Sequence, residues 1–292
     1  MRNIVLLIVC ITLTCPLIAQ TKRALVIGIG QYPAESGWAK IHGDNDIDII
    51  CTFLLKNGFQ KNNIITLQNE QATKNRIVES IKAIINSSKS NDFIYIHFSG
   101  HGQQITDLNN DEDDGYDEAW IPYDAEKYYK PVIYEGKNHL VDDEINLLLK
   151  ELKRKIGKDG QIIVIVDACH SGDSSRGEED EDSDEDIIRG TYDKFEIPNI
   201  RQSAVKKKNT IQWAIISACK SYQNNYECII NGKHYGSLSY SLYSQQSNLT
   251  NASLKTITEM LTKKMKEIIP NRSQTIEVDT PSFSSELILF KK

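Results

Sequence analysis

The feature that most constrains the fold of this chain is a repeated alternation of two kinds of segment. Short apolar runs rich in β-branched residues recur along the sequence, and longer stretches with helical spacing of apolar residues separate them. The predicted strands cover residues 24–29, 64–67, 93–98, 162–166, 211–217 and 286–290. The predicted helices cover residues 44–57, 74–87, 142–155 and 253–268. This alternation is typical of a mostly parallel sheet with helices on both faces, so we predict an α/β fold.

Two of the predicted strands end in turns that carry reactive side chains. The run at 93–98 leads into SGHG, which contains His101, and the run at 162–166 leads into DACHSG, which contains Cys169. In such sheets the reactive site lies beyond the carboxyl ends of the strands, where both residues are expected. A free thiol has a pKa of about 8.5, and a neighbouring imidazolium stabilises the reactive thiolate. The pair therefore predicts nucleophilic catalysis by a cysteine peptidase.

Cys169 has an alternative interpretation, because most free cysteines are buried structural residues. The residues around it are polar or small, with Asp167 before it and Ser171 and Gly172 after it. Such surroundings are not typical of an apolar core, so they favour a catalytic role. Gly102 follows the histidine, and its backbone N–H is predicted to hold the reaction's oxyanion together with that of Cys169.

The other histidines fit the catalytic role less well. His97 lies within its strand and is expected to be packed, and the side chain of His170 should point away from the face of the thiol. The remaining three are expected in helical or loop contexts without such a turn: His42, His139 and His234.

The first twenty residues have the layout of a secretory signal peptide. Arg2 gives a positive start, an apolar stretch follows at residues 4–13, and residues 17–19 resemble a cleavage site. We therefore predict export to the periplasm or the extracellular space, with an uncleaved membrane anchor as the alternative. No later segment is apolar enough over a sufficient length to span a bilayer.

The composition argues against several classes of protein. The net charge of −6 gives no electrostatic support for a nucleic-acid partner. After removal of the signal, Cys51, Cys169, Cys219 and Cys228 remain, which is too few for a disulfide scaffold, and no CxxC pair suggests zinc. The chain beyond residue 20 is expected to form one domain and to be a monomer.

Two segments are strongly acidic. Eight of nine residues are acidic at 178–186, which predicts an extended, solvated linker. The basic residues Arg176 and Arg189 bracket this linker, and self-cleavage at either is a hypothesis. Residues 107–118 carry seven acidic residues in twelve but do not fit an EF-hand. With Asp142 and Asp143 they offer oxygen ligands for calcium, although a solvated acidic loop is the alternative.

The motifs together resemble those of the caspase-type cysteine peptidases, and most closely those of the metacaspases. The similar segments run from Arg23 to the C-terminus, and the two most specific, FSGHGQQ and IVDACHSG, carry the histidine and the cysteine. The others are ALVIGIGQY, GDNDIDIICTFLLKNGF, DGYDEAWIPYDA, LVDDEINLLL and ISACKSYQ.

The resemblance implies a caspase-like three-layer α/β sandwich around a mostly parallel six-stranded sheet, with Cys169 as nucleophile and His101 as general acid and base. It implies a substrate pocket formed by Asp46, Ser99 and Asp167. Two carboxylates in such a pocket would bind Arg or Lys and repel Asp, so cleavage after Arg or Lys is expected.

The resemblance also implies activation by calcium, without a catalytic role for the ion, at positions matching Asp117, Asp142 and Asp143. No organic cofactor is expected. The implied organisation is a signal peptide at 1–20 and a peptidase domain at 21–292. That domain divides into a large-subunit-like part (21–177), an acidic linker (178–190) and a small-subunit-like part (191–292). The alternative function is a catalytically silent module of the same fold that binds calcium or peptides.

Overall fold

The computed structural model describes residues 20–169, 187–198, 211–281 and 290. Its centre is a six-stranded sheet in the order β11-β8-β7-β3-β1-β2. These strands are β1 (Lys22–Gly28), β2 (Ile64–Gln68), β3 (Phe93–Ser99), β7 (Gln161–Asp167), β8 (Ala214–Ser217) and β11 (Glu277–Asp279). The first five pair in parallel, and the edge strand β11 pairs antiparallel with β8.

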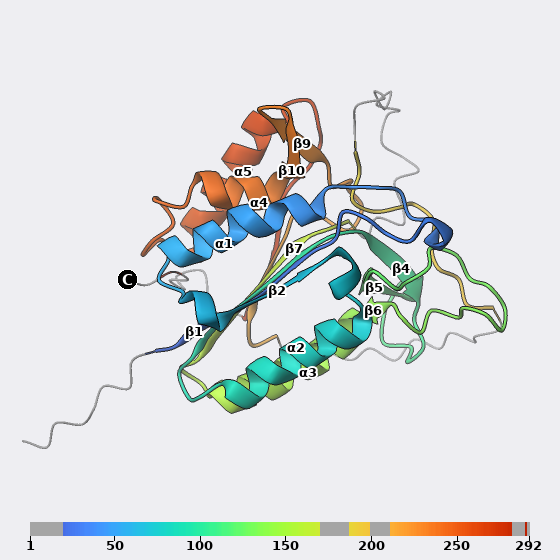
Figure 1. The fold of residues 1–292 in the computed structure, drawn as a ribbon, viewed down its shortest axis with the longest axis horizontal. Helices are drawn as coiled ribbons and strands as arrows, with labels where there is room; N and C mark the ends of the chain where they lie inside the picture. Colours follow the sequence, from blue (N-terminus) through green and yellow to red (C-terminus); the bar gives the residue numbers. More distant parts are fainter. Residues whose placement is uncertain (1–19, 170–186, 199–210, 282–289, 291–292) are drawn as a thin grey trace, which may run out of the picture.

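Helices cover both faces of this sheet (Figure 1). One face carries α1 (Asp46–Lys56), α4 (Ser237–Ser244) and α5 (Leu254–Ile268), and the other carries α2 (Lys74–Ser87) and α3 (Asp142–Ile156). Each face has its own apolar core, because the strands present buried side chains alternately to the two layers. Thr73 and Ser253 cap α2 and α5 by accepting a backbone N–H of the first turn.

Two small sheets and four short 3-10 helices complete the described fold. One sheet joins β4 (Gly102–Thr106), β5 (Tyr116–Trp120) and β6 (Leu140–Val141), and the other is the hairpin of β9 (Glu227–Ile230) and β10 (Lys233–Gly236). The 3-10 helices are η1 (Ala34–Ser36), η2 (Gly43–Asn45), η3 (Lys61–Asn63) and η4 (Asn69–Gln71).

The predicted fold class is confirmed, and the first four predicted strands and all four predicted helices are present within a few residues. The strand expected at 211–217 begins only at Ala214. The segment at 286–290 is largely outside the described residues, and the sixth strand of the sheet is β11 instead. Helix α4 was not predicted, and the expectation of a loop or helical position for His234 is wrong, because it lies in β10.

Residues 1–19 of the predicted signal peptide (1–20) and most of the acidic linker lie outside the described residues. Within the part of the chain that is described, no helix combines the length and the apolar character needed to cross a membrane.

Candidate active site

The two predicted catalytic residues emerge from neighbouring strands at the same edge of the sheet. Ser99 at the end of β3 pairs with Asp167 at the end of β7, and Gly100 N–H donates to the Asp167 carbonyl at 3.4 Å. His101 and Cys169 each lie two residues beyond this pair. The parallel register therefore brings the two reactive side chains to one sheet edge, as the sequence predicts.

The side chain of His101 is buried against two aromatic rings, and one of its ring nitrogens forms a hydrogen bond. Its ring stacks on Trp38 with 4.8 Å between ring centroids and lies 5.2 Å from Tyr32. Nε2 lies 2.9 Å from the carbonyl oxygen of Ala39. Because a carbonyl only accepts hydrogen bonds, Nε2 carries the hydrogen and Nδ1 of the neutral ring is a proton acceptor. Within the described residues, the buried Nδ1 has no hydrogen-bond partner.

Burial also sets the protonation state of this histidine. It lowers the pKa of His101 to about 4, and the hydrogen bond that the ring donates to the Ala39 carbonyl opposes that shift only in part. The imidazole is therefore neutral near pH 7 and able to take a proton.

Cys169 is buried and contacts a segment that is distant in sequence. Its Sγ donates to the carbonyl of Gln223 at 2.9 Å, and its backbone N–H donates to the carbonyl of Arg189 at 2.7 Å. Gly190 follows so closely that a Cβ there would lie 2.8 Å from the Cβ of Cys169. The peptide bond between Arg189 and Gly190 thus lies against the predicted nucleophile.

The side chain of Arg189 fills the predicted acidic pocket. Its Nη1 lies 2.7 Å from Asp46 Oδ2, 2.5 Å from Ser99 Oγ and 3.8 Å from Asp167 Oδ1. Its Nε donates to Glu227 Oε1 at 3.0 Å. The structure therefore brings Asp46, Ser99 and Asp167 together around one guanidinium group, and it adds Glu227 as a third carboxylate.

The carboxylates of this pocket are oriented by further hydrogen bonds. Asp46 Oδ1 accepts the backbone N–H of Gly236 at 3.0 Å. Asp167 Oδ2 accepts the N–H and the hydroxyl of Ser239 at 2.7 and 2.6 Å. A Cβ at Gly236 would lie 2.2 Å from Asp167 Oδ2, so only glycine leaves room for the pocket at this position.

Charge and burial oppose one another in the pocket. Burial raises the pKa of Asp46 to about 6, and the Arg189 guanidinium limits that rise. The pKa of Glu227 is lowered because Arg189 and His42 outweigh the effect of its burial. The pKa of Arg189 is raised by the surrounding carboxylates despite its burial. The pocket therefore favours a buried cation.

The backbone before Arg189 lies beside a second segment like an added strand. Arg189 N–H donates to the carbonyl of Asn225, and Glu227 N–H donates to the carbonyl of Ile187, both at 2.9 Å. Ile188 forms an antiparallel bridge with Tyr226. Peptide ligands of many proteins bind in this way, through backbone hydrogen bonds with side chains in pockets.

Three residues of the acidic segment 107–118 form a second cluster. Oxygens of Asp107, Asp111 and Asp117 all lie within 4.8 Å of one another. Burial and the neighbouring carboxylates raise the pKa of Asp117 to about 7 and that of Asp142 to about 8. In the described part of the chain, Oδ1 of each of these two has no hydrogen-bond partner.

The predicted set and the observed cluster overlap only in part. Asp143 is hydrogen-bonded by Asn109. Asp107, which is not among the three positions that the resemblance implies, accepts N–H groups of Asn109, Asn110 and Glu112. The two remaining site predictions, the orientation of His170 and self-cleavage at Arg176, concern residues outside the described ranges.

Sequence reasoning missed the groups that orient the predicted residues. The hydrogen-bond partner of His101 is the backbone carbonyl of Ala39, which no side-chain pattern could reveal. Glu227 lies in an ordinary strand segment, and no motif marked it. His97, which was expected to be packed, is fully buried.

Comparison with solved structures defines the class of fold. Protein GSU0716 from Geobacter sulfurreducens superposes with a TM-score of 0.65 at 21% identity, over 93% of this chain and 97% of that one. Caspase-1 from Spodoptera frugiperda superposes with a TM-score of 0.60 at 11% identity, over 94% and 93%. The fold is therefore the caspase-like α/β fold.

Sequence comparison identifies the family. The family model described as the metacaspase, peptidase C14 domain matches residues 22–175, and the chain belongs to this family. Metacaspase-1A from Aspergillus oryzae is 32% identical over 161 residues, which cover 52% of this chain and 35% of that protein. The chain thus matches about a third of the length of that curated relative.

Proposed function

We propose that this protein is a cysteine endopeptidase that cleaves after arginine or lysine, with Cys169 as nucleophile and His101 as general base and acid. The observation that carries the proposal is the position of Arg189. Its guanidinium lies among Asp46, Ser99 and Glu227, while its carbonyl oxygen accepts the Cys169 N–H at 2.7 Å. These are the two contacts that a substrate residue before the cleaved bond requires.

The proposed reaction begins with loss of the Cys169 proton to Nδ1 of His101. The thiolate can no longer donate to the Gln223 carbonyl, so the sulfur is released to attack the substrate carbonyl carbon. The oxyanion is stabilised by the Cys169 N–H and, as predicted from sequence, the Gly102 N–H. His101 then protonates the leaving amine, and water hydrolyses the thioester with His101 accepting its proton.

The proposed specificity follows from the chemistry of the pocket. A lysine ammonium can pair with Asp46, but a planar guanidinium contacts Asp46 and Glu227 through different nitrogens. We therefore expect both residues to be accepted, with arginine preferred. A negatively charged aspartate in this pocket would be repelled by the three carboxylates.

We also propose that the protein cleaves its own chain between Arg189 and Gly190. This bond already lies beside Cys169, and the backbone of Ile187 and Arg189 is held by two hydrogen bonds. Until it is cut and displaced, Arg189 occupies the pocket and competes with external substrates.

Calcium binding at the acidic cluster is proposed as a regulatory feature. Asp107, Asp111 and Asp117 offer carboxylate oxygens of the kind calcium prefers. Asp142 and Asp143, predicted as ligands together with Asp117, interact electrostatically with it. A cation there would neutralise carboxylates that now raise one another's pKa. Export through residues 1–20 stays a proposal based on the layout of that segment alone.

The proposed activity is tested with fluorogenic peptides that place Arg, Lys or Asp before the reporter group, in the presence of reductant, with and without calcium. We expect hydrolysis of the arginyl and lysyl peptides and none of the aspartyl peptide. Absence of hydrolysis under every condition, including after cleavage of the 189–190 bond, would favour a silent binding module.

A further inference from the structure

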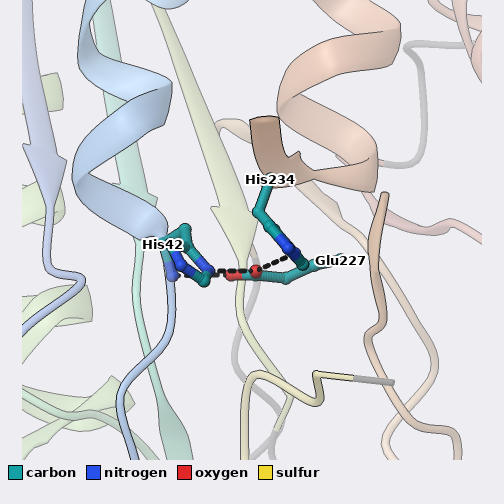
Figure 2. Close-up of side chains that lie close together, drawn as sticks. All are labelled: His42, Glu227 and His234. Atoms are coloured by element: carbon teal, nitrogen blue, oxygen red, sulfur yellow. Dashed lines mark hydrogen bonds and ion pairs between the residues drawn. The ribbon is translucent and has the colours of Figure 1, made fainter. Parts of the chain in front are cut away.

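Three potential metal ligands meet beside the arginine pocket, outside the proposed catalytic pair. His42 Nδ1 lies 2.8 Å from Glu227 Oε2, and His234 Nδ1 lies 3.5 Å from the same oxygen. Figure 2 shows both imidazole rings directed at the carboxylate of Glu227, and dashed lines mark the interaction of each with it. The rings are stacked, with 4.4 Å between their centroids, and the three ligand atoms all lie within 4.8 Å of one another.

The fold fixes all three residues. In the hairpin of β9 and β10, Glu227 pairs with Gly236 and Ile229 pairs with His234, so Glu227 and His234 lie on the same face. The side chain of Glu227 meets no side chain directly opposite, because its partner is glycine. His42 directly precedes η2, and its backbone N–H donates to Glu227 Oε1 at 2.7 Å. Asn45 donates to the backbone carbonyl of His234 at 2.9 Å.

Among the described residues, one buried ring nitrogen of this cluster lacks a hydrogen-bond partner. Glu227 Oε1 is held by the His42 N–H and by Arg189 Nε, and these bonds orient the carboxylate. Nδ1 of His234 is buried, and among the described residues it has no hydrogen-bond partner. A buried ring nitrogen without a partner is costly, and a metal ion would satisfy it.

We propose that His42, Glu227 and His234 form a binding site for Zn²⁺, with His42 Nδ1, His234 Nδ1 and Glu227 Oε2 as ligands. Two imidazoles and one carboxylate are a ligand set that zinc favours, and water would take the fourth position. Calcium and magnesium prefer oxygen ligands alone, so they should not compete effectively. The existing bonds to Oε1 would serve as the outer contacts that orient a ligating carboxylate. Binding at His42 Nδ1 requires the hydrogen now shared with Glu227 to leave that nitrogen, either for Nε2 of the same ring or for solvent.

The site is coupled to the arginine pocket through one carboxylate. Zinc on Oε2 would draw negative charge from Glu227, whose Oε1 holds Nε of Arg189. Zinc should therefore weaken binding of an arginine side chain in the pocket, and by linkage a filled pocket should weaken zinc binding. This coupling rests on the proposed function, whereas the zinc site itself does not.

Metal binding is tested on the full chain carrying Cys169→Ala, which removes the proposed nucleophile. Zn²⁺ binding is measured by calorimetry, and Co²⁺ is used as a spectroscopic probe of the ligands. We expect one ion per chain and a cobalt spectrum of tetrahedral nitrogen and oxygen ligation without thiolate charge-transfer bands. Removal of a group that only orients a ligand lowers metal affinity by about 10–100-fold. His42→Ala and His234→Ala each remove a ligand, so each should weaken zinc binding by at least that factor.

Lys233→Ala, a change of an exposed neighbour with no ligand atom, serves as the matched control and should leave zinc binding unchanged. Thermal unfolding without metal checks that the histidine variants are folded. Unchanged zinc affinity in both histidine variants, or a thiolate cobalt spectrum, would overturn the proposal, as would absence of binding to the folded parent. If zinc binds as expected but does not raise KM for an arginyl peptide in the active protein, only the coupling fails.

Discussion

The backbone N–H of Cys169 donates a hydrogen bond of 2.7 Å to the carbonyl oxygen of Arg189. The same arginine is fully buried among the carboxylates of Asp46, Asp167 and Glu227. One residue of the chain thus meets both requirements of a substrate, a cation in an acidic pocket and a carbonyl at the nucleophile. The predictions below follow from this relationship and from the groups around it.

The proposed catalytic pair is tested by His101→Ala and Cys169→Ala. Loss of a general base and acid is expected to lower kcat for an arginyl peptide by about 10²–10⁴-fold, and loss of the nucleophile should remove turnover. Cys51→Ala is the matched control, because Cys51 is a partly buried residue of α1 and should not affect kcat. Activity that survives both site variants would exclude this pair.

Glu227 should set the preference for arginine over lysine. Glu227→Gln removes the charged partner of the guanidinium Nε, whereas a lysine ammonium can still pair with Asp46. A hydrogen bond to a charged group is worth about 1.5–3 kcal/mol, so the ratio of kcat/KM for arginyl over lysyl peptides should fall at least about tenfold. Measurements with a zinc-selective chelator at constant calcium keep zinc out of the comparison. Glu196→Gln, at an exposed carboxylate, should leave the ratio unchanged.

Arg189 should be a large contributor to the stability of the uncleaved chain. In a Cys169→Ala background, Arg189→Ala leaves three buried carboxylates without their cation, and breaking a buried ion pair costs about 3–5 kcal/mol. The free energy of unfolding from urea titration should fall by that amount, and millimolar methylguanidinium should restore part of it by filling the pocket. Arg154→Ala, at an exposed position of α3, should change stability little. Equal effects of the two substitutions would contradict the packing described here.

The acidic cluster should make stability depend on pH and calcium. The pKa of Asp142 is raised to about 8 in the folded protein. Above pH 8 this side chain is ionised in both states, and the free energy of unfolding is lowered by the full cost of its buried charge. The penalty declines as pH falls, because the folded protein protonates Asp142 first, and it disappears near the unfolded pKa of about 3.9.

Asp142→Asn mimics the protonated form and should therefore raise the melting temperature above pH 8 without calcium. A gain of about 1 kcal/mol would be roughly 2–4 °C, and it should vanish near pH 4. Calcium should stabilise the wild type at pH 8 and stabilise this variant less. Asp159→Asn, at an exposed site, is the control. A wild type insensitive to calcium would contradict calcium binding at this cluster.

The sequence predicted the sheet and the strand-end residues because both depend on local patterns. Apolar β-branched runs mark β1, β3 and β7, and strand ends of a parallel sheet meet at one edge, which placed His101 and Cys169. Helix α4 escaped prediction because its buried face carries serines, which bond to Asp167 and to the helix itself instead of forming an apolar stripe.

The orienting groups could not be predicted because they depend on contacts between distant segments. Glu227 meets His42 across 185 residues of sequence, and Ala39 acts through its backbone carbonyl. The docking of Arg189 depends on the complete pocket, although its basic side chain next to an acidic run had marked it as a cleavage candidate. Local sequence patterns therefore indicated the proposed reacting groups, and only tertiary contacts identified the groups that position them.

The most direct test is the intact mass of the purified protein after incubation with reductant and calcium, compared with that of Cys169→Ala. We predict two fragments in the wild type, one ending at Arg189 and one beginning at Gly190, and an uncut variant. Fragments with other ends, or the same fragments in Cys169→Ala, would contradict the interpretation of Arg189 as a substrate of its own chain. So would an uncut wild type that hydrolyses arginyl peptides.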